Sequence, residues 1–233
     1  MPRLRPPKLL HAGRRDAFPD PRSADEEGLV AVGGDLSPWR LMQGYSRGIF
    51  PWYNGGVPPL WWSPDPRTVL ERERLHVSRS LRRVIRQRRF RVTCDQAFGE
   101  VMQSCADERS EGTWILPEML DAYLELFHQG HAHSFEVWQA DRLVGGLYGV
   151  AVGRAFAVES MFHRERDASK VGLVQCVEAL FDAGLELFDV QFLTDHLASL
   201  GAREISRDSY LARLEHAQRE PSMSWSGLAN RSW

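Results

Sequence analysis

The sequence has 233 residues, of which 43% are hydrophobic and 26% are charged, and its formal net charge is −2. This composition fits a chain that buries a real core, and it excludes a disordered, fibrous or polycationic protein. No apolar run reaches the roughly 20 residues of a membrane span, and the N-terminus lacks the apolar stretch of a secretory signal. Three widely spaced cysteines form neither a disulfide framework nor a zinc motif. We therefore expect a cytoplasmic protein without a metal, and a monomer.

The N-terminal half is predicted to be mostly helical. Residues 1–27 are rich in Pro, Arg and acids and are expected to form an irregular arm. The following elements are a helix that begins near Pro38, runs through Tyr45 and is ended by Gly48, and turns and short extended pieces over 49–70. They are followed by a helix over 78–87, a strand over Phe90–Thr93, a helix capped by Asp95, and a helix opened by Pro117 and ended by Gly130.

The second half alternates apolar and polar residues in the manner of strands. It is predicted to contain strands over 133–139, 142–150, 154–161 and 186–193, and helices over 170–183, 195–200 and 208–216. This order predicts an α+β fold with a small N-terminal domain and a larger domain whose mixed sheet is flanked by helices. We place the N-terminal domain at 28–94, the larger domain at 95–220 and a tail at 221–233.

A basic block occupies residues 72–91, which hold nine arginines and one glutamate. On a helix, the apolar residues would face inward and the arginines outward, where guanidinium groups suit phosphate oxygens. The block is either a solvated face paired with acids elsewhere or a nucleic-acid-binding surface. The candidate phosphate-binding residues are Arg79, Arg82, Arg83, Arg86, Arg88 and Arg89.

Three polar residues lie within apolar strands: Glu159, Asp189 and Gln191. A buried carboxylate needs a partner, so these residues form either a structural network or a functional site. The glycine-rich stretch over 144–153 matches no nucleotide-binding motif, and we expect its glycines to permit a close approach of chain or ligand. The histidines at 128, 131 and 133 have no metal-ligand spacing.

The chain resembles the leucyl/phenylalanyl-tRNA–protein transferase family from about Gly28 to Tyr210. The stretches that carry the resemblance are Gly33-Gly-Asp-Leu-Ser-Pro, Arg47-Gly-Ile-Phe-Pro-Trp, Trp61-Trp-Ser-Pro-Asp-Pro-Arg, Glu111-Gly-Thr-Trp-Ile, Gly130-His-Ala-His-Ser-Phe-Glu-Val-Trp, Leu143-Val-Gly-Gly-Leu-Tyr-Gly-Val, Glu159-Ser-Met-Phe, Ala168-Ser-Lys and His196-Leu-Ala-Ser-Leu-Gly-Ala. The resemblance implies that the larger domain is similar to the Gcn5-related acetyltransferase fold. It also implies transfer of Leu or Phe, and Met less well, from aminoacyl-tRNA to proteins that begin with Arg or Lys. The product would enter the N-degron degradation pathway, and no cofactor would be required.

The resemblance further implies roles for single residues. Asp189 and Gln191 match catalytic positions, with Glu159 beside them, and Trp52 and Trp114 match positions near the aminoacyl-adenosine. The residues that match the pocket for the Leu or Phe side chain are Leu147, Phe156, Met161, Cys176 and Phe188. Cys176 stands where a larger apolar residue is expected, which bears on the volume of that pocket.

The implied reaction is aminolysis of an ester by an α-amine, whose pKa of roughly 7.7–8.0 leaves a neutral fraction at pH 7. Alignment of the reactants would then supply much of the acceleration. In this hypothesis Asp189 holds the cationic acceptor N-terminus, and Gln191 orients the amine or the ester. One alternative is a CoA-dependent N-acetyltransferase, although residues 162–170 lack the glycines of a pyrophosphate loop. The other is an RNA-binding module without catalysis, which leaves the three polar residues without a purpose.

Overall fold

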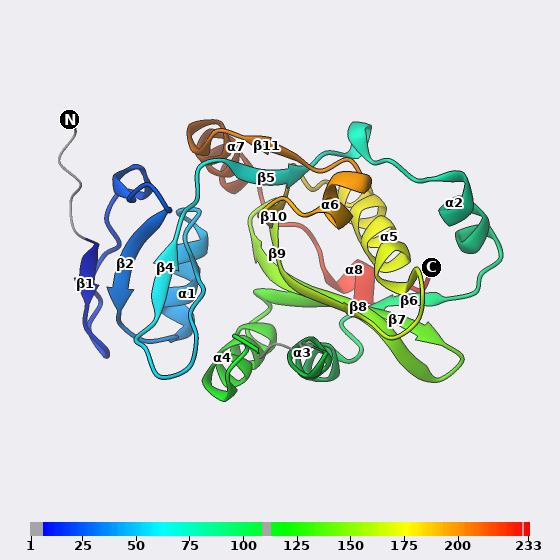
Figure 1. The fold of residues 1–233 in the computed structure, drawn as a ribbon, viewed down its shortest axis with the longest axis horizontal. Helices are drawn as coiled ribbons and strands as arrows, with labels where there is room; N and C mark the ends of the chain where they lie inside the picture. Colours follow the sequence, from blue (N-terminus) through cyan, green and yellow to red (C-terminus); the bar gives the residue numbers. More distant parts are fainter. Residues whose placement is uncertain (1–6, 109–112, 230) are drawn as a thin grey trace.

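A computed structural model describes residues 7–108, 113–229 and 231–233. The first part of the chain forms a four-stranded sheet, in the order β1-β2-β4-β3, beside one helix (Figure 1). Its elements are β1 (Lys8–Leu10), the 3-10 helix η1 (Pro21–Ser23), β2 (Leu29–Gly33), α1 (Pro38–Tyr45), β3 (Phe50–Pro51) and β4 (Leu60–Trp62). Helix α1 begins at its proline, where a missing N–H breaks no hydrogen bond.

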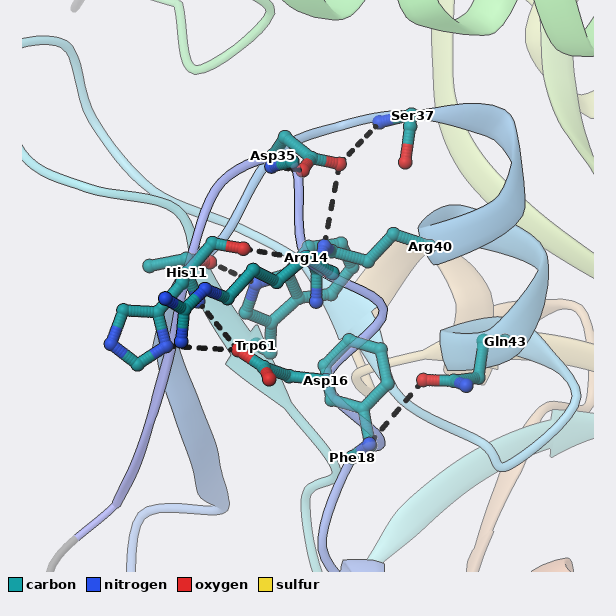
Figure 2. Close-up of polar contacts among 11 residues, drawn as sticks. His11, Arg14, Asp16, Phe18, Asp35, Ser37, Arg40, Gln43 and Trp61 are labelled. Atoms are coloured by element: carbon teal, nitrogen blue, oxygen red, sulfur yellow. Dashed lines mark hydrogen bonds and ion pairs between the residues drawn. The ribbon is translucent and has the colours of Figure 1, made fainter.

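Arg40 anchors the segment that precedes β2 (Figure 2). Its fully buried guanidinium donates through Nη2 to the carbonyl oxygens of His11 (3.1 Å) and Arg14 (2.5 Å), and through Nε to Asp35 Oδ1 (3.3 Å). Asp35 Oδ2 in turn accepts from the backbone N–H of Gly13 at 2.8 Å. Part of the segment expected to be an irregular arm thus forms the strand β1. The polar contacts of Arg40 and Asp35 hold the loop that follows this strand.

The rest of the chain builds a seven-stranded mixed sheet in the order β11-β5-β10-β9-β8-β7-β6. All neighbours are antiparallel except β9 and β10, which run parallel. The strands are β5 (Arg67–Leu70), β6 (Arg91–Cys94), β7 (Ala132–Gln139), β8 (Arg142–Val152), β9 (Ala155–His163), β10 (Leu187–Gln191) and β11 (Arg203–Ile205). The structure therefore confirms the expected α+β class, with mixed sheets flanked by helices.

Helices cover both faces of this sheet (Figure 1). They are η2 (Arg72–Arg74), α2 (Arg79–Arg86), α3 (Phe98–Asp107), α4 (Pro117–His128), α5 (Ala168–Asp182), α6 (Asp195–Ser199), α7 (Arg207–Arg219) and α8 (Ser226–Ala229). Leu147 of β8 belongs to the core shared with α5, whereas its neighbour Tyr148 belongs to the core shared with α3 and α4. Burial on both faces explains why β8 reads as a nearly continuous apolar run. None of the helices in the described ranges is long and apolar enough to span a membrane.

Two glycines allow α5 to lie close to the sheet. A Cβ on Gly145 of β8 would lie 3.0 Å from the Cβ of Ala168, the first residue of α5. A Cβ on Gly172 would lie 2.7 Å from a methyl group of Val137 on β7. At Gly145, the close approach expected for the glycine-rich stretch is therefore to a helix of the same chain.

The strand pairing changes two details of the expected organisation. Strands β5 and β6, which we expected in the N-terminal domain at 28–94, both pair within the seven-stranded sheet, and we propose a boundary near residue 66. The tail docks on the edge strand β6, because Val92 and Trp233 exchange two backbone hydrogen bonds of 2.9 and 3.0 Å.

Asp95 does not cap α3, which begins at Phe98; its carboxylate instead accepts from the backbone N–H of Ser134 at 2.9 Å.

Candidate active site

A cavity of about 580 Å³ opens where the parallel strands β9 and β10 cease to pair. Their last paired residues are Ala157 and Asp189, and the residues that follow on both strands line the cavity. Strand β3 of the N-terminal sheet forms the facing wall. The cavity is lined by Phe50, Pro51, Trp52, Trp114, Val158, Glu159, Ser160, Met161, His163, Ser169, Val190, Gln191, Phe192, Thr194, His196 and Leu197.

Gln191 and Glu159 form a polar pair in the wall of this cavity. Gln191 Nε2 donates to Glu159 Oε1 at 2.6 Å, and the two side chains come from strands 32 residues apart in sequence. Gln191 has a φ of 63°, a backbone conformation that non-glycine residues rarely adopt, and the register of β10 against β5 shifts at this residue. This irregularity lets Gln191 line the cavity although Asp189 does not.

Asp189 is sealed in the interior by Arg67 of β5. Its two oxygens accept from Arg67 Nε at 2.9 Å and Nη2 at 2.5 Å, and both side chains are only 1% exposed. Asp189 also accepts from the hydroxyl of Tyr210 at 2.9 Å and from the backbone N–H of Gln191 at 2.9 Å. The carboxylate is therefore already neutralised and out of the cavity, so the predicted direct contact with an acceptor amine does not fit this geometry. Because it accepts from the Gln191 backbone, we propose that Asp189 positions Gln191.

Glu159 lies in a different electrostatic environment. Burial raises the pKa of Glu159 to about 8. The hydrogen bond from Tyr45 lowers this pKa, and the nearby charge of Asp189 raises it. Its Oε2 accepts from the hydroxyl of Tyr123 at 3.3 Å, and that hydroxyl shares a 2.5 Å hydrogen bond with the hydroxyl of Tyr45. Burial also raises the pKa of both tyrosines, so they stay protonated. Glu159 thus changes its charge near the pH at which an α-amine does.

Aromatic side chains form the mouth of the cavity. Trp52 is 44% exposed and its ring centroid lies 5.7 Å from that of Phe192, which is 40% exposed. Trp114 lines the same cavity, and the contact of the two tryptophans with the aminoacyl-adenosine stays a prediction. Residues 111 and 112, which belong to the same sequence stretch, lie outside the described residues. Phe192 was missed by the sequence analysis, although it directly follows Gln191.

The five residues expected around the Leu or Phe side chain are not all at the cavity. Met161 lines it. The other four, Leu147, Phe156, Cys176 and Phe188, are buried in the core between the sheet and α5. The rings of Phe156 and Phe188 lie 5.9 Å apart there. None of these four residues lines the cavity, and their role in the pocket stays a prediction.

The six candidate arginines of the basic block lie away from the cavity, on α2 and just after it. All six predicted phosphate-binding arginines are exposed. Arg89 pairs with Glu165 at 3.1 Å, which connects the end of the block to the loop that precedes α5. A groove of about 770 Å³ between α2 and α5 is lined by several of the arginines, among them Arg79, Arg82 and Arg86. This surface offers an exposed cationic face next to the sheet.

The arrangement offers an aromatic mouth that can bind a flat group and an amide–carboxyl pair that can orient a nucleophile. Two family models match the chain, the leucyl/phenylalanyl-tRNA protein transferase N-terminal domain over residues 34–65 and the leucyl/phenylalanyl-tRNA protein transferase over residues 69–215. The chain belongs to the leucyl/phenylalanyl-tRNA–protein transferase family, and it is therefore an aminoacyltransferase.

Named relatives agree with this assignment. The chain is 55% identical to a leucyl/phenylalanyl-tRNA–protein transferase of Anaeromyxobacter sp. (strain Fw109-5), over 90% of this chain and 91% of the relative. It is 52% identical to that of Escherichia coli O157:H7 (strain EC4115 / EHEC), over 94% and 95%. Among solved structures, L-PGS from Bacillus licheniformis matches 82% of this chain and 66% of its own length at 11% identity, with a TM-score of 0.40.

Proposed function

We propose that this enzyme transfers Leu or Phe, and Met less well, from aminoacyl-tRNA to the N-terminal Arg or Lys of acceptor proteins. The transfer would take place in the cytoplasm and mark the acceptors for the N-degron pathway. The observation that carries the proposal is the cavity in which Gln191 and Glu159 lie together with Trp52 and Trp114. It offers a stacking surface for the terminal adenosine and a polar pair for the reacting amine.

Gln191 is the residue that we assign to the amine. Its Nε2 is occupied by Glu159, so its carbonyl oxygen Oε1, which makes no hydrogen bond among the described residues, can accept from the attacking α-amine. The amine nitrogen attacks the ester carbonyl, a C–N bond forms, the bond from that carbon to the ribose oxygen breaks, and the amine proton passes to the ribose oxygen. The side chain thereby fixes the lone pair on nitrogen toward the ester.

Glu159 sets the state of this pair. Because its pKa is about 8, the protonated form predominates at neutral pH, and the buried site avoids a second full negative charge beside Asp189. Glu159 is the one carboxyl group among the described lining residues. The preference for a basic acceptor rests on the family resemblance together with this group, which gains negative charge as the pH rises.

The α2 arginines are proposed to hold tRNA phosphates. Guanidinium groups on an exposed helix can form paired hydrogen bonds with phosphate oxygens. Five of the six have no ion pair among the described residues, and Arg89 alone is engaged, by Glu165. Binding that depends on such contacts should weaken steeply as salt is added.

The test is a transfer assay with Phe-tRNA and a peptide that begins with Arg, read by mass spectrometry. We expect the peptide to gain one Phe residue, and the same peptide with an acetylated N-terminus to gain none. Gln191→Ala should abolish the gain, whereas Gln103→Ala, an exposed glutamine on α3, should leave it unchanged. Tight tRNA binding with no transfer would support an RNA-binding module instead. Acetylation of the peptide by acetyl-CoA would point to the acetyltransferase alternative.

A further inference from the structure

A second cavity, of about 570 Å³, adjoins the reaction cavity at the start of α5. It is lined by the loop over 163–167, by the first turn of α5 and by His196. Three residues, His163, Ser169 and His196, line both cavities. A ligand group that leaves the reaction cavity at this wall enters the second cavity.

Ser169 lies at this junction and has a free hydroxyl. Ser169 is only 6% exposed and lines both cavities. Its Oγ makes no hydrogen bond among the described residues. The close packing of Ala168 on Gly145 explains why this first turn of α5 is so deeply set. A hydroxyl that lines a cavity wall and has no protein partner is available to donate to, or accept from, a ligand atom.

Lys170 brings a positive charge to the same place. The chain has only two lysines, Lys8 and Lys170, against 27 arginines. Lys170 is half-buried in the first turn of α5, which carries no acidic residue, and it has no ion pair among the described residues. A cation at a helix N-terminus is disfavoured by the helix dipole, so an anion that binds there would relieve an unfavourable arrangement.

The other charges that line this cavity are paired within the protein. Arg164 donates to Glu108 at 2.8 Å, Glu165 pairs with Arg89 at 3.1 Å, and Arg166 lies 3.9 Å from Asp167. His196 is kept neutral, since burial first and the neighbouring Lys170 second lower its pKa. Lys170 is thus the uncompensated cation of the described lining.

We propose that Ser169 and Lys170 bind the phosphate diester on the 5′ side of the terminal adenosine of the aminoacyl-tRNA. This inference rests on the proposed function, and it extends the donor site by one phosphate. If the aromatic mouth holds the adenosine, its 5′ phosphate has to leave the reaction cavity at a polar wall, and the second cavity supplies an unpartnered hydroxyl and an ammonium there. The Arg89–Glu165 contact then leads from this cavity to the α2 arginines, which gives the single-stranded tRNA end a continuous path.

The experiment compares two donors that differ in phosphate. One is phenylalanyl-adenosine, which has none, and the other is the phenylalanyl ester of the trinucleotide CCA. The readout is the KM of each donor in transfer to an Arg peptide, and the ratio of the two. In Lys170→Met we expect the KM of the trinucleotide to rise about 10- to 100-fold, as for the loss of one charged hydrogen bond, with little change for phenylalanyl-adenosine. Lys8→Met is the matched control and should change neither KM.

Two further variants separate charge and hydroxyl from packing. Lys170→Arg keeps the charge and should recover most of the trinucleotide affinity, whereas Ser169→Ala should shift the KM ratio in the same direction as Lys170→Met by a smaller factor. An equal rise for both donors, no rise for either, or no rescue by Lys170→Arg would overturn the assignment.

Failure of the proposed function has a different signature. Wild-type enzyme would then transfer Phe from neither donor, and binding of uncharged CCA against adenosine, followed by tryptophan fluorescence, would decide the phosphate site alone. Lys170-dependent binding of CCA would support the site, and Lys170-dependent binding of CoA in place of CCA would overturn it.

Discussion

Replacing Asp189 by Asn asks whether this carboxylate acts through the fold or on the substrate. Asn keeps the shape of the side chain but removes the charge that neutralises Arg67, and both side chains are 1% exposed. Removing one partner of a buried ion pair costs roughly 3–5 kcal/mol, because the other charge stays buried without compensation. Since domains of this kind are stable by about 5–15 kcal/mol in total, Asp189→Asn should lose about a fifth or more of the free energy of unfolding.

The assay is urea unfolding at pH 7, with the transfer rate measured on the same preparations. Asp121→Asn, an exposed position on α4, serves as the matched control and should change the free energy of unfolding by less than about 0.5 kcal/mol. The double variant of Arg67→Met with Asp189→Leu removes both charges. The free energy of unfolding of this double variant should exceed that of Asp189→Asn by about 2 kcal/mol or more, because no unpaired charge is left in the interior.

An Asp189→Asn enzyme that unfolds within about 1 kcal/mol of wild type, yet loses transfer more than about a hundredfold, would show that the carboxylate acts on the substrate directly. The ion pair with Arg67 would then have to open during the reaction.

The remaining predictions concern the polar pair, the N-terminal segment and the basic block. Gln191→Ala should lower kcat by about a hundredfold or more but lower the free energy of unfolding by only about 1 kcal/mol, measured by the transfer assay and urea unfolding; a loss as large as that of Asp189→Asn would contradict it. For Glu159 the folded pKa of about 8 lies above the ordinary 4.5, so its stabilising contribution is complete below about pH 4.5 and is lost as the pH rises through 8; the free energy of unfolding of wild type should fall between pH 5 and 9 more than that of Glu159→Gln. Asp35 has the opposite sign, because its hydrogen bonds hold the pKa near 2 against the opposing effect of burial; Asp35→Ala should cost about 1–2 kcal/mol at pH 7, and titration of urea unfolding should show this difference shrinking as the pH falls from 4 to 2. Arg82→Ala or Arg83→Ala should reduce the slope of log Kd against log salt for tRNA by about 1 each, as fluorescence titration at several salt concentrations would show, and an unchanged slope would exclude phosphate contact.

Local patterns predicted most of the regular structure. The alternation over 133–161 gave the antiparallel strands β7 to β9, and the period of the apolar residues after Lys170 gave α5, because each element buries a face that the sequence displays directly. The short pieces over 49–70 were also expected from their Pro and Gly content. Strand β11 and the tail elements were missed, since pairing partners far away in sequence, and no local period, hold them in place.

The candidate site was predicted only in part. A carboxylate in an apolar strand needs a partner, so a partner for Asp189 was expected. Which of the 29 lysines and arginines it would be could not be predicted from sequence, because Arg67 is 122 positions away from Asp189. The role that we propose for Asp189 changed for that reason. Because Arg67 holds it inside the sheet, Asp189 does not face the cavity, and we propose that it positions Gln191. Phe192, Ser169 and His196 were missed as lining residues because only the end of the β9–β10 pairing brings them together.

The end of that pairing also explains how two buried carboxylates acquire different tasks. Ala157 and Asp189 are the last paired residues of β9 and β10, so Asp189 lies within the closed sheet, where Arg67 can reach it from β5. Two residues further along each strand, β9 and β10 are no longer paired, and the side chains of Glu159 and Gln191 meet at the cavity. A cation compensates the first carboxylate, whereas the second has no cation in hydrogen-bond contact, and burial raises its pKa to about 8. The end of this strand pairing therefore places a buried ion pair at Asp189 and, two residues further along β9 and β10, the polar pair of Glu159 and Gln191.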